Sequence, residues 1–204
     1  RDLGVMLMGD IDKYFHYDFA VTNGSIPCKD DNNNTKDIYA SVTIKPFKNF
    51  NVKATYNWGE YNPQALAGGT APGVGVSKYM PMNRFVVGAW YNDPNGLDLR
   101  AEYGFMKSDK GGDTYVDEQG AYVLAGYHAG KFLPIVRWDM YKDDVNKTSA
   151  GCNYNRILVG CTYQLFKNVK IQLNYGHFMY SDDVKNAGGL EKSEQVQLMG
   201  LFKF

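Results

Sequence analysis

In the segment EQVQLMGLFKF (Glu194–Phe204), apolar residues recur at every second position. One face carries Val196, Leu198, Gly200, Phe202 and Phe204, and the other carries Gln195, Gln197, Met199 and Lys203, with Leu201 as an exception. A period of two is typical of a β-strand that has one apolar and one wet surface. Because an edge strand of a soluble protein has the same pattern, the assignment of the fold depends on whether the rest of the chain repeats this alternation.

The same alternation recurs along the whole chain. In DIYASVTIKPF (37–47), for example, apolar Ile38, Val42 and Ile44 are separated by polar residues. We expect about eleven strands, at 2–11, 15–24, 37–47, 50–61, 79–92, 96–107, 119–129, 131–142, 153–166, 168–181 and 194–204. The segment GAYVLAGYHAG (120–130) has the weakest alternation, and no long segment shows helical spacing.

The composition allows one domain over residues 1–204 and excludes several classes of protein. Lysine plus arginine equals aspartate plus glutamate at 22 each, so no net charge attracts nucleic acid. The hydrophobic fraction is 44%, and no apolar run approaches the ~20 residues of a membrane helix, which excludes a helical membrane protein but not a membrane β-barrel. The 16 tyrosines, 11 phenylalanines and 22 glycines suit barrel strands with aromatic girdles and tight turns.

The connections between the expected strands alternate between short and long. The short ones are DIDKY, PFKN, NDPNG, AGK and FKN, which have the composition of hairpin turns. The long ones are 23–37, 60–78, 108–118, 143–152 and 181–193. An outer-membrane barrel has short turns at its periplasmic end and long loops at its extracellular end. A soluble β-protein is not expected to place all short turns at one end of its strands and all long loops at the other. The alternation therefore favours a transmembrane antiparallel β-barrel, with a soluble β-protein as the alternative.

The three cysteines are too few for a complete disulfide framework. Cys28 and Cys152 lie in polar, loop-like stretches and could pair in an oxidising compartment, whereas Cys161 is expected to pack as a small apolar residue in a strand. The opening RDLGVMLMGD is already in strand-like alternation. This favours a sequence that starts inside a longer protein over one from which a signal peptide was removed.

Several segments together resemble one family of membrane proteins. RDLGVMLMGD, YDFAVTNG, the following Asn/Asp-rich stretch, KDIYASVTIKPF and the terminal phenylalanine resemble the C-terminal part of the phosphate-selective porin O and P family of Gram-negative outer membranes. The resemblance implies a sixteen-stranded barrel in the outer membrane, usually a homotrimer, that passes anions or small solutes. An odd number of strands cannot close a single-chain antiparallel barrel, so we expect about five further strands. Phe202 and Phe204 resemble the signal that the outer-membrane assembly machinery recognises.

No enzyme signature emerges from the sequence. GGTAPGVGVSK (68–78) lacks the spacing of a phosphate-binding loop, and His16, His128 and His177 lack the spacing of zinc ligands. His177 could belong to a membrane phospholipase only with a positioned serine and an orienting asparagine, which the pattern does not supply. The paired aspartates of the loops indicate solvation more than calcium binding. We therefore expect no catalytic residues, no metal and no cofactor.

The wet face of the expected strands carries charged residues that would line a pore. We expect the pore-lining residues to be Lys53, Arg84, Arg100, Glu102, Arg137, Asp139, Arg156 and Lys170, with Asp18 and Asp98 also on this face. Arg100 could pair with Glu102, and Arg137 with Asp139. Because bases outnumber acids in this set, we expect a modest preference for anions, against the alternative of a balanced wall with no preference.

Three functions follow from these patterns. The first is a porin for passive diffusion of small solutes, with a modest anion preference and phosphate preference left open. The second is an outer-membrane barrel whose long loops bind a partner or a host surface. The third is a soluble β-rich binding protein, which dependence on detergent would separate from the other two.

Overall fold

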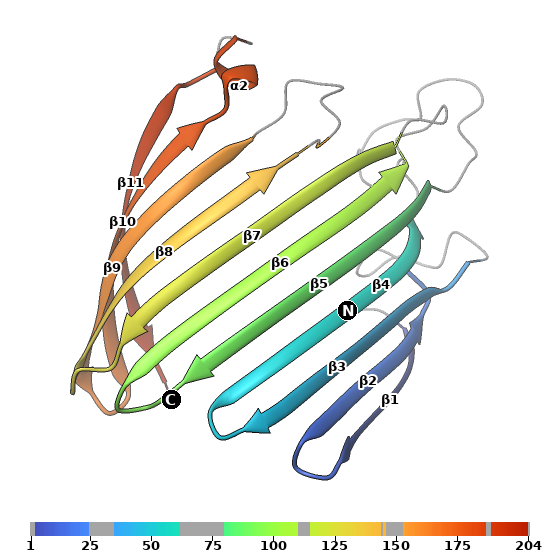
Figure 1. The fold of residues 1–204 in the computed structure, drawn as a ribbon, viewed down its shortest axis with the longest axis horizontal. Helices are drawn as coiled ribbons and strands as arrows, with labels where there is room; N and C mark the ends of the chain where they lie inside the picture. The colour runs from blue at the N-terminus through green and yellow to red at the C-terminus, as the bar shows by residue number, and fades with distance from the viewer. Residues whose placement is uncertain are drawn as a thin grey trace.

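The computed structural model describes residues 3–24, 35–61, 80–109, 115–143, 145, 153–186 and 189–203. These residues form a single antiparallel sheet of 11 strands in which every strand pairs with its neighbours in the sequence (Figure 1). The expected all-β architecture of successive antiparallel strands is therefore confirmed. Cys28, Cys152 and Phe204, for which the sequence predicts a possible disulfide and part of an assembly signal, lie outside the described residues.

The strands agree closely with the expected segments. They are β1 (Gly4–Ile11), β2 (Phe15–Thr22), β3 (Asp37–Phe47), β4 (Phe50–Tyr61), β5 (Met80–Asn92), β6 (Leu97–Asp109), β7 (Tyr115–Tyr127), β8 (Phe132–Lys142), β9 (Tyr154–Phe166), β10 (Val169–Tyr180) and β11 (Lys192–Phe202). A short helix, α2 (Asp182–Asn186), lies in the connection between β10 and β11. Within the described residues, no helix is both long enough and apolar enough to cross a membrane.

The largest difference from the expected strands concerns β6 and β7. Their pairing continues toward the long connection as far as Asp109 and Tyr115. β7 therefore begins four residues before the expected start at position 119 and ends two before the expected end at 129. The weak alternation of this segment gave little indication of its ends, which the ladder of hydrogen bonds with β6 determines.

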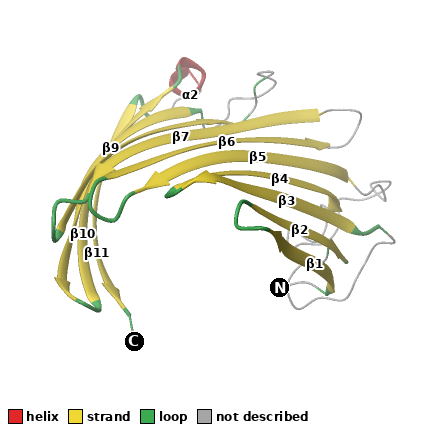
Figure 2. Ribbon diagram, turned by 60° about the horizontal axis from the view of Figure 1, so that its bottom comes forward, coloured by secondary structure: helices red, strands yellow, loops and turns green. Residues whose placement is uncertain are grey.

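The sheet is curved, and its two faces differ in polarity. Figure 2 shows that the strands bend round to form part of a barrel wall with a concave side. The most buried residues alternate along the strands and share one face: Ala20, Ser41, Thr43, Asp98, Asp139 and Asn174. Side chains on the inside of a curve are crowded by their neighbours, so this buried face is the concave one.

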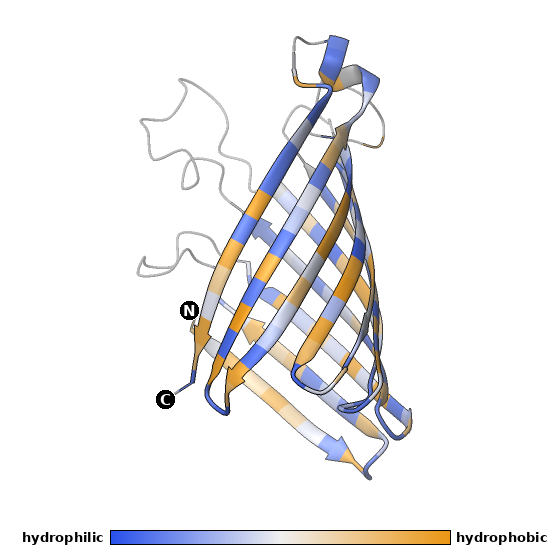
Figure 3. Ribbon diagram, turned by 90° about the vertical axis from the view of Figure 1, so that its left-hand side faces the viewer, coloured by the Kyte–Doolittle hydropathy of each residue, from blue (hydrophilic) through white to orange (hydrophobic). Residues whose placement is uncertain are grey.

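The opposite, convex face is apolar and exposed. Val196 and Leu198 are each 71% exposed, and Leu173 is 54% exposed. Ala20 is the one buried hydrophobic residue in the described part of the chain, so these strands form no conventional apolar core. The alternation of colours along the strands in Figure 3 follows the same change of face. An apolar exterior around a polar interior is the arrangement of a membrane barrel rather than of a soluble sandwich.

Short turns and long connections lie at opposite ends of the strands, as the sequence predicts (Figure 1). Asp12 (φ 59°) and Asn49 (φ 66°) adopt the left-handed backbone conformation in the first two short turns, and Gly130 (φ 62°) does so in the fourth. Aspartate, asparagine and glycine tolerate this conformation best. The expected separation of short turns from long connections is therefore confirmed for the described residues.

The two outer strands of the sheet are β1 and β11. Because successive strands are antiparallel and the number of strands is 11, β1 and β11 run in the same direction. β1 and β11 each have one edge that pairs with no other strand in the described part of the chain. An antiparallel barrel needs an odd number of further strands between these two edges.

Candidate functional site: the concave wall

The predicted pore-lining residues all lie on the concave face. Cross-strand pairing joins Lys53 to Gly88, Gly88 to Glu102, and Glu102 to Tyr122. The same row continues from Tyr122 to Asp139 and from there to Arg156. The other four predicted residues lie on the same face: Arg84, Arg100, Arg137 and Lys170. Each is an even number of residues along its strand from a member of this row, or pairs across strands with a residue that is. Register therefore brings the predicted residues together on one wall.

Arg100 pairs with Asp98 and not with Glu102, contrary to the sequence prediction. Its Nε donates to Asp98 Oδ1 at 2.8 Å, and its Nη2 donates to Asp98 Oδ2 at 2.7 Å. Asp98 is 1% exposed, and His128 Nε2 lies 3.9 Å from its Oδ2. A buried carboxylate without a partner is costly, so the guanidinium is held by the more deeply buried of its two acidic neighbours.

Asp139 binds two arginines from neighbouring strands. Arg137 Nε donates to Asp139 Oδ1 at 2.7 Å, and Arg156 Nε donates to Asp139 Oδ2 at 3.0 Å. The expected pairing of Arg137 with Asp139 is therefore confirmed, whereas the sequence gave no indication that Arg156 shares the same carboxylate. The three side chains together retain one positive charge.

Aromatic rings support both arginines of this cluster. The guanidinium carbon of Arg137 lies 4.1 Å from the centroid of the Tyr122 ring, and that of Arg156 lies 5.2 Å from the Phe178 ring. Tyr154 packs against Phe178 with ring centroids 5.4 Å apart. Cation–π contacts of this kind contribute about 0.5–1 kcal/mol each at partly exposed sites. These contacts hold the arginines against the concave wall.

Four predicted pore-lining residues form no ion pair among the described residues, although Lys53 lies close enough to Asp18 to interact with its charge. Lys53, Glu102 and Lys170 make no hydrogen bond and no ion pair within the described part of the chain. Arg84 donates to two thioether sulfurs, those of Met106 at 3.3 Å and Met82 at 3.0 Å. Their charges are therefore not neutralised by a direct ion pair within the described residues.

Three carboxylates that were not among the predicted pore-lining residues also lie on the concave wall. Asp10 pairs with His16, Asp37 with Thr22, and Glu118 with Met106 across their strands, which puts all three on this phase. Asp37 is the first residue of the expected strand 37–47, whereas Glu118 fell within the expected loop 108–118 and is included because β7 begins at Tyr115. With these residues counted, bases no longer outnumber acids on the described concave face.

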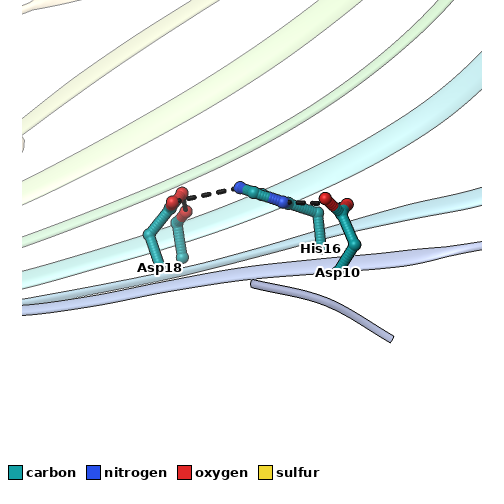
Figure 4. A network of polar contacts seen from close by, with 4 residues as sticks. Asp10, His16 and Asp18 are labelled. Atoms are coloured by element: carbon teal, nitrogen blue, oxygen red, sulfur yellow. Dashed lines mark hydrogen bonds and ion pairs between the residues drawn. The ribbon is translucent and has the colours of Figure 1, made fainter. Parts of the chain in front are cut away.

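A polar network joins β1, β2 and β3 on the same face (Figure 4). His16 Nδ1 lies 3.0 Å from Asp10 Oδ1, and His16 Nε2 lies 3.1 Å from Asp18 Oδ1. The Ser41 hydroxyl donates to Asp18 Oδ2 at 2.6 Å. The serine contacts the carboxylate and not the imidazole, so the geometry is that of a structural network and not of a nucleophile with its base.

Phe202 is 66% exposed on the convex face, and its ring covers Gly200, where an added Cβ would lie 3.1 Å from the ring. Its role as an assembly signal stays a prediction. In the described part of the chain, no three histidine, cysteine, aspartate or glutamate side chains lie close enough together to hold a metal ion.

Comparison with known proteins identifies the fold. No protein-family model and no curated protein matches the chain. A solved porin aligns with 98% of this chain and 61% of its own length, with a TM-score of 0.66 and 12% identity. OmpT, an outer membrane protein of Vibrio cholerae, aligns with 97% of this chain and 62% of its own length, with a TM-score of 0.61 and 15% identity.

A loop L8 deletion mutant of the same OmpT gives a TM-score of 0.63 at 15% identity, over 98% of this chain and 62% of its own length. The chain therefore spans less than two thirds of the length of the solved structures that it resembles. At these identities the likeness concerns the fold, which is the β-barrel of outer-membrane porins.

Proposed function

We propose that this chain forms part of an outer-membrane porin, a water-filled channel for passive diffusion of small solutes, and that it is not an enzyme. The observation that carries the proposal is the inverted polarity of the sheet. Leu198 on the convex face is 71% exposed, whereas the charged Asp98 and Asp139 on the concave face are 1% and 7% exposed. Such a sheet is stable where lipid covers its outer face and water fills its inner one. The outer membrane is the location that this arrangement fits.

The closed barrel would include strands from outside this sequence. The two open edges, on β1 and β11, run in the same direction and need an odd number of strands between them. Five further strands would give about sixteen, an even number in the usual range for such barrels. The coverage of 61–62% of the solved structures supports a chain that forms the larger part of such a barrel.

The proposed assembly is a homotrimer in the lipid bilayer, inserted by the outer-membrane assembly machinery. One solved form of OmpT from Vibrio cholerae, which covers 97% of this chain with a TM-score of 0.56, is described as a trimer. For the present chain the trimer rests on that likeness and on the family resemblance. Phe202, exposed near the end of β11, is the residue that we propose the assembly machinery contacts together with Phe204.

The proposed selectivity is a weak preference for small anions, including phosphate. Basic residues on the concave face support it, because three of them form no ion pair among the described residues: Lys53, Arg84 and Lys170. Lys53 is partly offset by the nearby charge of Asp18. Asp10, Asp37 and Glu118 oppose it, because they add negative charge to the same face. The charges of a wide, water-filled lumen are also screened beyond ~8 Å at physiological salt. We therefore propose a weaker preference than the predicted pore-lining residues alone indicate.

Single-channel recording of the full-length protein in planar lipid bilayers tests the function. We expect discrete conductance steps and a reversal potential in a salt gradient that indicates slight anion preference. Replacing Lys53 and Arg84 together by Gln should shift the reversal potential toward cations without closing the channel. The absence of conductance steps from folded, inserted protein would contradict the proposed channel, and an unchanged reversal potential would contradict only the proposed selectivity.

A further inference from the structure

A pocket of 370 Å³ opens on the concave face where β5, β6 and β7 meet. It is lined by Gly88, Trp90, Asn92, Arg100, Glu102 and Tyr122, among others. Gly88 contributes to the opening, because a Cβ at this position would lie 3.5 Å from Glu102 Cγ and within 3.3 Å of the Ala101 carbonyl oxygen. The volume falls in the range of small-molecule sites, roughly 300–1,000 Å³.

The pocket is lined by the Arg100 guanidinium, whose charge is balanced by Asp98 behind it, and by the Glu102 carboxylate, which Arg100 does not bind. Arg100 uses Nε and one hydrogen of Nη2 to bind Asp98, which leaves the donors of Nη1 and the second hydrogen of Nη2 unused. Its side chain is 44% exposed. Glu102 is exposed and has no hydrogen bond or ion pair within the described part of the chain.

The spacing of these two groups suits a ligand that carries both charges. Arg100 and Glu102 are two residues apart on one face of β6, so their Cα atoms lie about 7 Å apart along the strand. A carboxylate bound to the guanidinium and an ammonium bound to Glu102 would both fit in this interval if they belong to one small molecule. The Trp90 and Tyr122 side chains, which also line the pocket, offer aromatic surface to the remainder of that molecule.

We propose that this pocket binds a small zwitterion of the α-amino acid class, with its carboxylate on Arg100, its ammonium on Glu102 and its apolar part against Trp90 and Tyr122. The site rests on the proposed function, because solutes reach it only if the concave face lines a water-filled lumen. It adds a binding step for one class of solute to passive diffusion.

Calorimetric titration of the folded full-length protein in detergent micelles tests the pocket directly. L-leucine carries both charges, 4-methylpentanoate lacks the ammonium, and 3-methylbutylamine lacks the carboxylate. We expect L-leucine to bind at least about tenfold more tightly than either analogue, since each analogue loses one charge-assisted contact. Equal binding of 4-methylpentanoate and L-leucine would overturn the proposal in favour of a simple anion site.

The Glu102→Gln variant separates the two halves of the site. It should raise the dissociation constant of L-leucine about tenfold and leave that of 4-methylpentanoate unchanged. Glu194→Gln, which removes an exposed carboxylate from the convex phase of β11, is the matched control and should change neither. An unchanged affinity of Glu102→Gln for L-leucine would overturn the site.

Conductance of the same preparation distinguishes failure of the pocket from failure of the channel. Conducting protein that binds no L-leucine would overturn the pocket and leave the porin function standing. Protein that binds L-leucine but does not conduct would support the pocket and contradict the channel.

Discussion

Asp98 and Glu102 each lie two residues from Arg100 on the same face of β6, but only Asp98 binds its guanidinium. The two carboxylates differ in exposure, since Asp98 is 1% exposed and Glu102 is exposed to the lumen side. Water can solvate Glu102, whereas Asp98 depends on a protein partner. Arg100 therefore stabilises the fold through its contact with Asp98.

We expect Asp98→Asn to lower the free energy of unfolding by about 2 kcal/mol, because it removes a charge-assisted pair from a buried position. Glu102→Gln is the matched control and should change stability by less than about 0.5 kcal/mol. Urea unfolding from lipid vesicles, followed by tryptophan fluorescence, measures both. A larger loss for Glu102→Gln than for Asp98→Asn would contradict the observed pairing.

Asn49 forms the second short turn with φ 66°, a conformation that β-branched residues avoid. We expect Asn49→Val to destabilise the protein by about 1–2 kcal/mol, whereas Asn49→Gly should be close to neutral. The same unfolding measurement applies. Equal effects of the two substitutions would mean that the turn does not need the left-handed conformation.

At the scale of the strand, β10 shows how the two faces differ. Leu173 is 54% exposed on the convex face, and the neighbouring Gln172 and Asn174 point to the concave side. Asn174 is 5% exposed and its amide packs onto Gly160, where an added Cβ would lie 2.1 Å from Asn174 Oδ1. Although Asn174 is polar, it is a packed residue of the wall and not part of its wet surface.

We expect Leu173→Arg to cost about 2–4 kcal/mol if the residue lies near the bilayer midplane. Gln172→Arg, on the wet face of the same strand, should cost much less. Asn174 is unsuitable as the control, because its replacement disturbs the packing against Gly160. Similar costs for Leu173→Arg and Gln172→Arg would contradict a lipid-facing convex surface.

The sequence predicted the strands and their faces because each depends on local alternation. Ile38, Val42 and Ile44 indicated the outward face of β3 without any knowledge of its partners. The ion pairs could not be predicted in the same way. Asp98 and Glu102 are equally spaced from Arg100, and the contact of Arg156 with Asp139 depends on the register of β8 with β9. Cross-strand register is not encoded in a period of two.

The short turns join the strands at one end of the sheet, and the long connections join them at the other (Figure 1). We expect the long connections to be extracellular and the short turns periplasmic. Single cysteines at Asn95, in a short turn, and at Asn186, in α2, test this in a background without the native cysteines. A membrane-impermeant thiol reagent on intact cells should label position 186 only. Labelling at 95 and not at 186 would invert the orientation.

On the proposed function, the concave face of this sheet lines a conducting lumen. Glu102 and Tyr103 are adjacent on β6 but point to opposite faces, and Tyr103 is 38% exposed on the convex one. Single-channel current through Glu102→Cys and Tyr103→Cys variants of the full-length protein, in a background without native cysteines, should be recorded before and after a cationic, water-soluble thiol reagent. We expect a stepwise fall in conductance for Glu102→Cys and no change for Tyr103→Cys. A fall confined to Tyr103→Cys would mean that the concave face does not line the conducting path.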